Sequence, residues 1–248
     1  MVRNRLVTVL TLNDGVLFRT KHFVPDYRYT SNFVDLWSID EIVVLDVTRP
    51  GHGDRAHFYE GVSRLASNCF VPLAVGGGVR SIDDARTLLA VGADKVVVNT
   101  GAINRPELIT EIATAYGAQC VVVSIDAARR DGGGYDVRSD FGTTSTGRSP
   151  EAWAKEAEDR GAGEIFITSI EKDGSLEGYD NELNQLVSRG VSVPVLVCGG
   201  AGNWQHFVDG FRIGGASAVC TTNIYHFTDT SIRSAKRFLE QAGISIRT

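Results

Sequence analysis

The sequence has 248 residues, of which 43% are hydrophobic and 22% charged, and a formal net charge of -5. A chain of this length holds either one large α/β barrel or two small domains, and its ordinary composition argues against disorder. The negative net charge excludes the general attraction to nucleic acid or anionic lipid that clustered Lys and Arg provide. A small anionic substrate therefore needs a local binding site.

Cysteine, histidine and apolar patterns give no sign of a metal centre, a cofactor or a membrane span. The cysteines lack paired C-x-x-C spacing, which is typical of buried free thiols in a reducing compartment, and the histidines lack H-E-x-x-H spacing. No apolar run approaches the roughly 20 residues of a membrane span, and the N-terminus lacks a full signal-peptide pattern. We expect no cofactor, no metal, no membrane contact and a cytoplasmic location.

Short apolar runs alternate along the chain with longer segments of helical period. Eight runs predict strands, at 6–12, 41–47, 71–75, 95–99, 120–126, 164–170, 193–199 and 217–222. Segments 81–93 and 149–162 predict amphipathic helices, each opened by a serine cap, whereas 16–30 reads as a long loop. Strands alternating with helices predict a parallel sheet, and eight repeats in this length predict a closed (β/α)₈ TIM barrel that forms one domain, 1–248.

An internal repeat favours the closed barrel over an open doubly wound sheet. VPLAVGGGVRSIDD begins at Val71 and VPVLVCGGAGNWQH at Val193, an offset of 193 - 71 = 122 residues. EIVVLDV at Glu41 and EIFITSI at Glu164 give nearly the same offset, 164 - 41 = 123. Matches at half the chain length predict a duplicated half-barrel.

Two glycine clusters mark candidate phosphate sites at the carboxyl ends of strands. GGGVRS at 76–81 and CGGAGN at 198–203 each precede a predicted helix. Glycine allows backbone N–H groups to approach an anion closely, although tight strand-to-helix turns need glycine in any case. Two clusters half a barrel apart suit a substrate with a phosphate at each end.

Charged residues begin four of the predicted strands. They are Arg5, Glu41, Lys95 and Glu164. Because side chains alternate between the two faces of a strand, three of these residues share a face with a later polar residue: Arg5 with Thr11, Lys95 with Asn99, and Glu164 with Thr168. If those later residues face the site, the charges face the barrel axis below it. Such charges are either solvated at the strand ends or paired in a ring across the bottom of the barrel, where burial is costly unless they pair.

These features together resemble the HisF family, the cyclase subunit of imidazole glycerol phosphate synthase, with the HisA isomerases as more distant relatives. The most specific segments are VGGGVRSIDDARTLLAVGADKVVVNT at 75–100, GAGEIFITSIEKDGSLEGYD at 161–180, and CGGAGN with the HF at 226–227. The resemblance covers nearly the whole chain and implies a (β/α)₈ barrel that docks on a HisH-like glutaminase at its amino-terminal face.

The resemblance also implies roles for particular residues. Ammonia from the glutaminase would enter through the ring of four charges, with Asp94 and Gln119 at the glutaminase interface. One phosphate of a bisphosphate substrate, or a phosphate or sulfate ion, would bind at Gly78, Asn99 and Thr100. The other would bind at a second set of residues, which are Asp173, Gly174, Gly200, Thr222 and Asn223.

The chain departs from the family at two functional positions. HisF uses two aspartates as general acid and base, and Asp126 matches one of them, whereas Thr11 stands in place of the other. Arg19 replaces a lysine of the loop that closes over substrate. A threonine hydroxyl cannot exchange a proton near neutral pH, and loss of a general acid or base costs about 10²- to 10⁴-fold in rate.

Three functions follow from this pattern. The first is a HisF-like subunit that passes ammonia to another acceptor, such as an enzyme that aminates or amidinates a sugar in surface-polysaccharide synthesis. The second is a working histidine-pathway cyclase in which Asp126 carries most of the proton transfer. The third is a non-catalytic activator of a glutaminase. Segment 16–30, which is basic and aromatic, serves either as a lid or as a partner contact.

Overall fold

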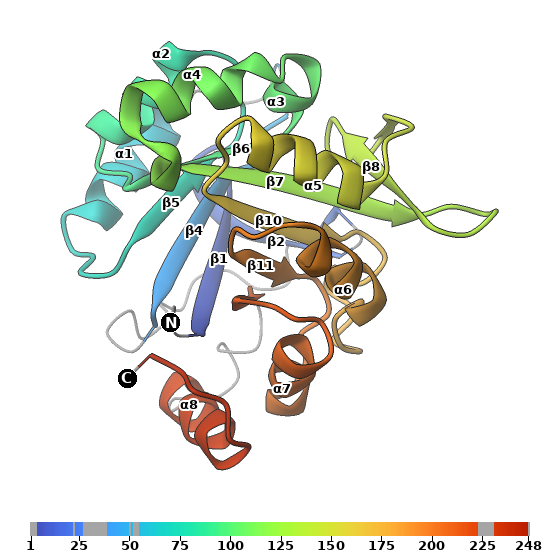
Figure 1. Cartoon of the computed structure of the whole chain (residues 1–248). Helices are drawn as coiled ribbons and strands as arrows, with labels where there is room; N and C mark the ends of the chain where they lie inside the picture. The colour runs from blue at the N-terminus through green and yellow to red at the C-terminus, as the bar shows by residue number, and fades with distance from the viewer. Residues whose placement is uncertain are drawn as a thin grey trace.

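The computed structural model contains a closed barrel of eight parallel strands with helices outside it (Figure 1). It describes residues 4–21, 23–26, 39–49, 51, 55–222 and 231–247. Neighbouring barrel strands pair in the order β1-β4-β5-β6-β7-β10-β11-β12, and β12 pairs back to β1. The predicted (β/α)₈ TIM barrel is therefore confirmed.

Each of the eight predicted strands forms a strand of the barrel. They are β1 (Arg5–Asn13), β4 (Glu41–Asp46), β5 (Leu73–Gly76), β6 (Lys95–Val98), β7 (Val121–Arg129), β10 (Glu164–Ser169), β11 (Val195–Cys198) and β12 (Ala218–Thr221). The sequences of these strands are continuous apolar runs because their outer faces pack against helices and their inner faces point into the barrel interior.

The helices lie on the outer surface of the barrel. They are α1 (Arg55–Ala66), α2 (Ile82–Ala90), α3 (Thr100–Asn104), α4 (Glu107–Tyr116), α5 (Pro150–Asp159), α6 (Asn181–Gly190), α7 (Trp204–Arg212) and α8 (Ser231–Gln241), with a 3₁₀ turn, η1 (Ala118–Cys120). Ser81 begins α2 with a complete capping box that includes Asp84, as predicted. Ser149 is the N-cap residue of α5, as predicted, although its side chain makes no cap hydrogen bond.

The spacing of elements agrees with a duplicated half-barrel. Strand β5 begins at 73 and β11 at 195, while α2 begins at 82 and α7 at 204, so both steps are 122 residues. Strand β4 begins at 41 and β10 at 164, a step of 123 residues. The sequence repeat and the structural repeat thus coincide.

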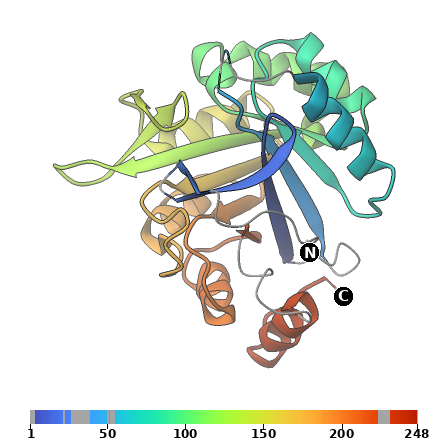
Figure 2. The same cartoon turned by 180° about the vertical axis from the view of Figure 1, so that it is seen from behind.

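The prediction of a loop over 16–30 is wrong in its first part. Strands β2 (Val16–Lys21) and β3 (Val24–Asp26) form antiparallel pairs that extend β1 (Figure 2). Asp14 and Gly15 adopt positive φ values of 49° and 73°, which is the turn geometry that suits a two-residue hairpin. The Asp-Gly pair between β1 and β2 was therefore a hairpin signal. Residues 27–30 lie outside the described residues.

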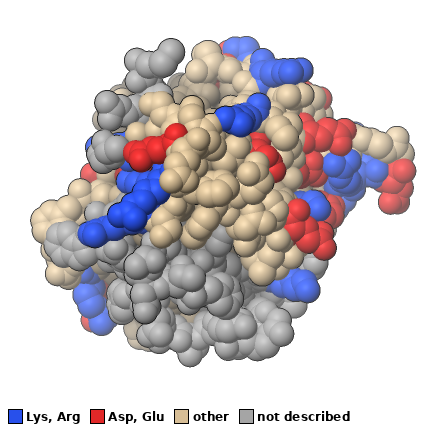
Figure 3. All heavy atoms as spheres, turned by 90° about the horizontal axis from the view of Figure 1, so that it is seen from below, with Lys and Arg blue, Asp and Glu red and all other residues tan. Residues whose placement is uncertain are grey.

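A second hairpin leaves the barrel after β7. Strand β8 (Tyr135–Ser139) pairs antiparallel with the extended end of β7, and β9 (Thr144–Ser145) pairs with β8. In Figure 3, charged side chains of both signs gather at the right of the view, where this hairpin projects. No helix among the described residues is long and apolar enough to cross a membrane.

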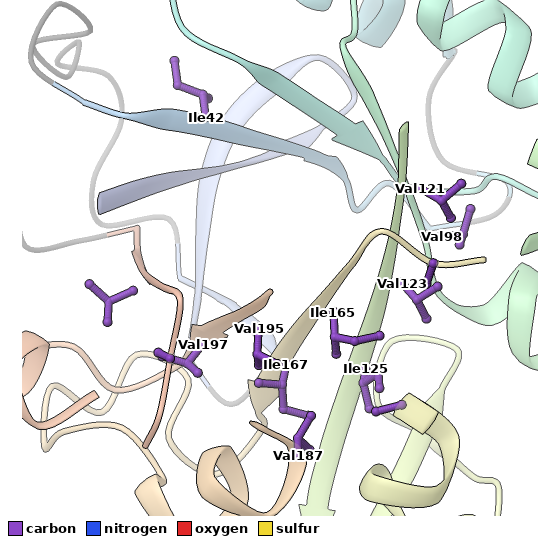
Figure 4. Packing of buried hydrophobic residues seen from close by; sticks show 14 of the residues in the cluster. Ile42, Val98, Val121, Val123, Ile125, Ile165, Ile167, Val187, Val195 and Val197 are labelled. Carbon is purple, nitrogen blue, oxygen red and sulfur yellow. The ribbon is translucent and has the colours of Figure 1, made fainter. Parts of the chain in front are cut away.

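Apolar side chains pack on both faces of the barrel strands. The outer cluster joins the strands to the helices: Ile165 and Ile167 of β10 lie beside Ile125 of β7, and Val187 of α6 packs with them (Figure 4). The inner cluster fills the lumen and includes Val7, Val9, Val43, Ala74, Val97, Val122, Phe166, Leu196, Ala218 and Cys220. The lumen is therefore a packed apolar column, as in other barrels of this class.

Candidate functional site

Four charged residues close the lower end of the lumen. Each is the first residue of its strand, and each shares the inward face with a residue of the inner cluster. The Nη1 atom of Arg5 lies 2.5 Å from Glu41 and 2.9 Å from Glu164. The Nζ atom of Lys95 lies 2.8 Å from each of the same two carboxylates. Of the two alternatives, solvated charges or a paired ring, the structure shows the paired ring, whereas a role in ammonia passage stays a prediction.

The cycle of ion pairs satisfies charges that are almost completely buried. The side chain of Glu41 is 1% exposed and that of Glu164 is 11% exposed. Burial alone would lower the pKa of Arg5, but the charges of Glu41 and Glu164 outweigh it and raise the pKa. Arg5 therefore stays charged, and because two basic side chains pair with two acidic ones, the formal charges at the floor of the barrel sum to zero.

Thr11 and Asp126 lie on opposite sides of the upper end of the lumen. Thr11 is on β1 and Asp126 on β7, and four steps of strand pairing separate these strands in an eight-stranded ring. Asn99 at the end of β6 donates from Nδ2 to Asp126 over 2.8 Å. Thr168 is the lateral neighbour of Asp126 on β10. Strand β7 thus presents a carboxylate at Asp126, whereas β1 presents a hydroxyl group at Thr11.

The environment of Asp126 brings its carboxyl group close to neutrality. Burial is the largest cause and raises the pKa, the hydrogen bond from Asn99 lowers it, and the charge of Asp173 raises it again. The resulting pKa is about 7. A carboxyl group of this kind can both accept and return a proton near neutral pH.

A pocket at the end of β11 brings together most of the second predicted phosphate set. Asp173, Gly174, Gly200 and Thr222 all line it. Gly200 has φ of 104°, and a Cβ atom there would lie 2.1 Å from the carbonyl oxygen of Gly178, so no other residue fits. Asn223, the last member of this set, lies outside the described residues.

Cys198 and Cys220 form part of the wall of this pocket. Burial raises the pKa of Cys198 to about 12, with further increases from the charges of Asp173 and Asp126. A thiol with so high a pKa is a poor nucleophile. Cys198 is therefore a wall residue of the pocket and not a nucleophile.

The first predicted phosphate set surrounds the end of β5. Gly78 has φ of 64°, and Gly101, directly after Thr100, packs so closely that a Cβ there would lie 2.1 Å from the carbonyl oxygen of Val79. The turns after β5 and β6 are therefore in contact. The side chain of Asn99 donates a hydrogen bond to Asp126. The side chain of Thr100 accepts one from the backbone N–H of Asp140. Asn99 keeps its buried Oδ1 atom without a hydrogen-bond partner.

The two residues predicted at the glutaminase interface lie at the amino-terminal end of the barrel. Asp94 directly precedes β6 and accepts a hydrogen bond from the backbone N–H of Leu73, while Gln119 lies in η1 before β7. Both are exposed. Arg19 lies on β2, and its side chain is not among the parts of the chain that the structure describes.

Two contacts near the candidate site were not predicted from the sequence. The backbone N–H of Phe23, beside β3, donates to the carboxylate of Asp173 over 3.2 Å. Arg55 at the start of α1 donates to the carbonyl oxygen of Gly77 over 2.7 Å. Neither residue stands in a motif that could have indicated its contact.

The fold and the site define a closed (β/α)₈ barrel with a charged floor and polar groups at the carboxyl ends of its strands. The model of the family described as "Histidine biosynthesis protein" matches residues 7–231. The chain is 42% identical over 253 residues to the imidazole glycerol phosphate synthase subunit HisF of Caulobacter vibrioides strain NA1000 / CB15N, and this covers 100% of the chain and 97% of that relative. The same protein of strain ATCC 19089 gives the same values. The chain belongs to the HisF family.

Proposed function

We propose that this chain is the synthase-side subunit of a glutamine-dependent amidotransferase, and that it receives ammonia from a HisH-like glutaminase through the barrel. The observation that carries the proposal is the neutral cycle of ion pairs at the floor of an apolar lumen. A neutral molecule such as ammonia crosses an apolar column at far lower cost than an ion does. Asp94 and Gln119, both exposed on the same side, are proposed contacts of the glutaminase.

We further propose that the upper end redirects ammonia to another acceptor, through amination or amidination of a sugar in surface-polysaccharide synthesis. Thr11 supports this role, because the hydroxyl group cannot replace a carboxylate in proton transfer near neutral pH. Asp173, Gly174, Gly200 and Thr222 support binding of a phosphate group or a related anion in the second pocket, and Gly78 supports a first anion site.

One observation favours a second function, the cyclase reaction of the named relatives. Asp126 has a pKa of about 7 and a fixed hydrogen bond to Asn99. A carboxyl group tuned in this way suits a general acid or base. Under this alternative, Asp126 carries the proton transfers that two aspartates share in the family.

Cyclase assays with ammonium salts separate these functions. The parent chain and Thr11→Asp are given the bisphosphate precursor, and formation of imidazole glycerol phosphate is measured. We expect little product from the parent and about 10²- to 10⁴-fold more from Thr11→Asp. Thr144→Asp, an exposed threonine of β9, is the matched control and gains nothing. Parent turnover at a normal rate would establish the cyclase and overturn the redirected role.

Glutaminase assays test the partner. Hydrolysis of glutamine by a purified HisH-type glutaminase is measured alone, with the parent chain and with Asp94→Asn, and Asp83→Asn on α2 is the control. We expect the parent to stimulate hydrolysis and Asp94→Asn to weaken the complex. Stimulation with all nitrogen released as free ammonia, even with the acceptor enzyme present, would identify a non-catalytic activator instead. No association with the glutaminase would overturn the proposal.

A further inference from the structure

Arg55 joins three separate elements beside the first glycine cluster. It is the first residue of α1, which follows β4. Its Nη2 atom donates to the carbonyl oxygen of Gly77 over 2.7 Å, and its Nη1 atom lies 3.4 Å from that of Gly78. Its Nε atom lies 3.4 Å from Asp46 at the end of β4, and the guanidinium packs over the ring of Tyr59 at 5.2 Å. The side chain is held on several sides and is only 33% exposed.

The turn that Arg55 contacts depends on outside support. Gly77 and Gly78 both have positive φ, 102° and 64°, and glycine has no side chain that could anchor the turn by packing. A Cβ on Gly78 would lie 3.3 Å from Nη1 of Arg55, so the guanidinium lies directly against the backbone of this turn. The planar fork of donors suits two adjacent carbonyl groups better than a single ammonium does. Arg55 therefore holds the shape of the turn.

Arg55 also offsets negative charge around the turn. Asp46 lies on one side of the guanidinium, and Asp84 of α2 lies 3.9 Å from Nη1. Partial burial alone would raise the pKa of Asp84, but hydrogen bonds from Arg80 and Ser81 and the charge of Arg55 outweigh it and lower the pKa. The lowered pKa keeps Asp84 ionised near neutral pH, and without the cation of Arg55 the acidic side chains beside the turn would repel a phosphate that approaches Gly78.

We propose that Arg55 is a positioning residue for an anion site at Gly78: it fixes the Gly77–Gly78 turn and neutralises Asp46 and Asp84, which allows a phosphate group to bind there. This inference rests on the proposed function in one respect, namely that the turn at Gly78 binds a phosphate group. It assigns Arg55 a role that neither its position in the sequence nor a motif reveals.

Titration calorimetry with inorganic phosphate tests the role of Arg55. We expect the parent to bind two phosphate ions, and Arg55→Gln to weaken one of them by about tenfold or more, the effect of losing a charge-assisted contact. Arg55→Lys keeps the charge but loses the fork, so we expect an intermediate affinity. Arg86→Gln removes the same charge from the exposed surface of α2, where Arg86 pairs with Asp83, and we expect no change.

Ionic strength separates the proposed role from a general loss of structure. If Asp46 and Asp84 repel the ion in Arg55→Gln, the loss of affinity is larger at 0.01 M than at 0.15 M salt, because salt screens the repulsion. Equal phosphate binding by Arg55→Gln and the parent, or a loss that is independent of salt, would overturn the inference. If Arg55→Gln does not fold, Arg55→Lys decides, since weaker binding supports the role and parent-like binding refutes it. A parent chain that binds no phosphate refutes the anion sites of the proposed function instead.

Discussion

Replacement of Glu41 by Gln tests whether the charged floor of the barrel is a mutually dependent unit. Glu41 is 1% exposed and binds both Arg5 and Lys95. The change leaves two buried cations facing Glu164 alone. Loss of one partner from a buried ion pair costs about 3–5 kcal/mol. A chain of this size loses about 2–4 °C in Tm for each kcal/mol, so we expect a fall of about 6–20 °C.

Thermal and urea unfolding followed by circular dichroism at pH 7 measure this loss. Glu60→Gln is the control, because Glu60 is 72% exposed and lies 3.7 Å from Arg64, and we expect it to cost less than about 1 kcal/mol. The double variant Glu41→Gln with Lys95→Met restores the balance of one cation and one anion, and should recover part of the loss. If Glu41→Gln unfolds at the same temperature as Glu60→Gln, the ring does not form in solution as described.

Two substitutions and one labelling experiment test the upper end of the barrel. The raised pKa of Asp126, about 7 against 3.8 for the unfolded carboxyl, means that the folded chain holds a proton that the unfolded chain releases. The free energy of unfolding of the parent should therefore fall between about pH 4 and pH 7. Asp126→Asn lacks this decline, so at pH 8 its free energy of unfolding, measured by urea titration, should exceed that of the parent by up to about 4 kcal/mol. If the free energies of unfolding of the two proteins change with pH in the same way, the pKa of Asp126 is not raised. Gly200→Ala, whose Cβ meets the carbonyl of Gly178, should cost at least about 3 kcal/mol, whereas Gly133→Ala, at φ of 92° in open space, should cost about 1–2 kcal/mol. Equal costs would show that Gly200 moves away from the clash. Cys198, with a pKa of about 12, should react with iodoacetamide at pH 8 far more slowly than Cys69, although both are partly exposed; peptide mapping would measure both rates, and equal rates would contradict the raised pKa.

The regular elements near the site were predictable because their signals are local. A strand buried on both faces reads as an unbroken apolar run, and each of the eight runs became a barrel strand. The hairpin between β1 and β2 was missed because segment 16–30 was interpreted as a loop, and the Asp14-Gly15 turn was not taken as a hairpin signal. Ser149 is the predicted N-cap residue of α5 but makes no side-chain cap hydrogen bond, since a residue type permits such a bond without ensuring its geometry.

Sequence alone determined which side chains share a face of each strand, because the two-residue period of a strand puts Arg5 with Thr11 and Lys95 with Asn99. It also determined the strand ends at which Asp126 and the two glycine clusters stand. Only the closed tertiary structure decided that β12 returns to β1 and β10 to β7, which brings Glu164 within reach of Arg5 and Lys95. Tertiary structure also decided the pKa of Asp126 and the contacts of Arg55, because burial and charge depend on neighbours that lie far away in the chain.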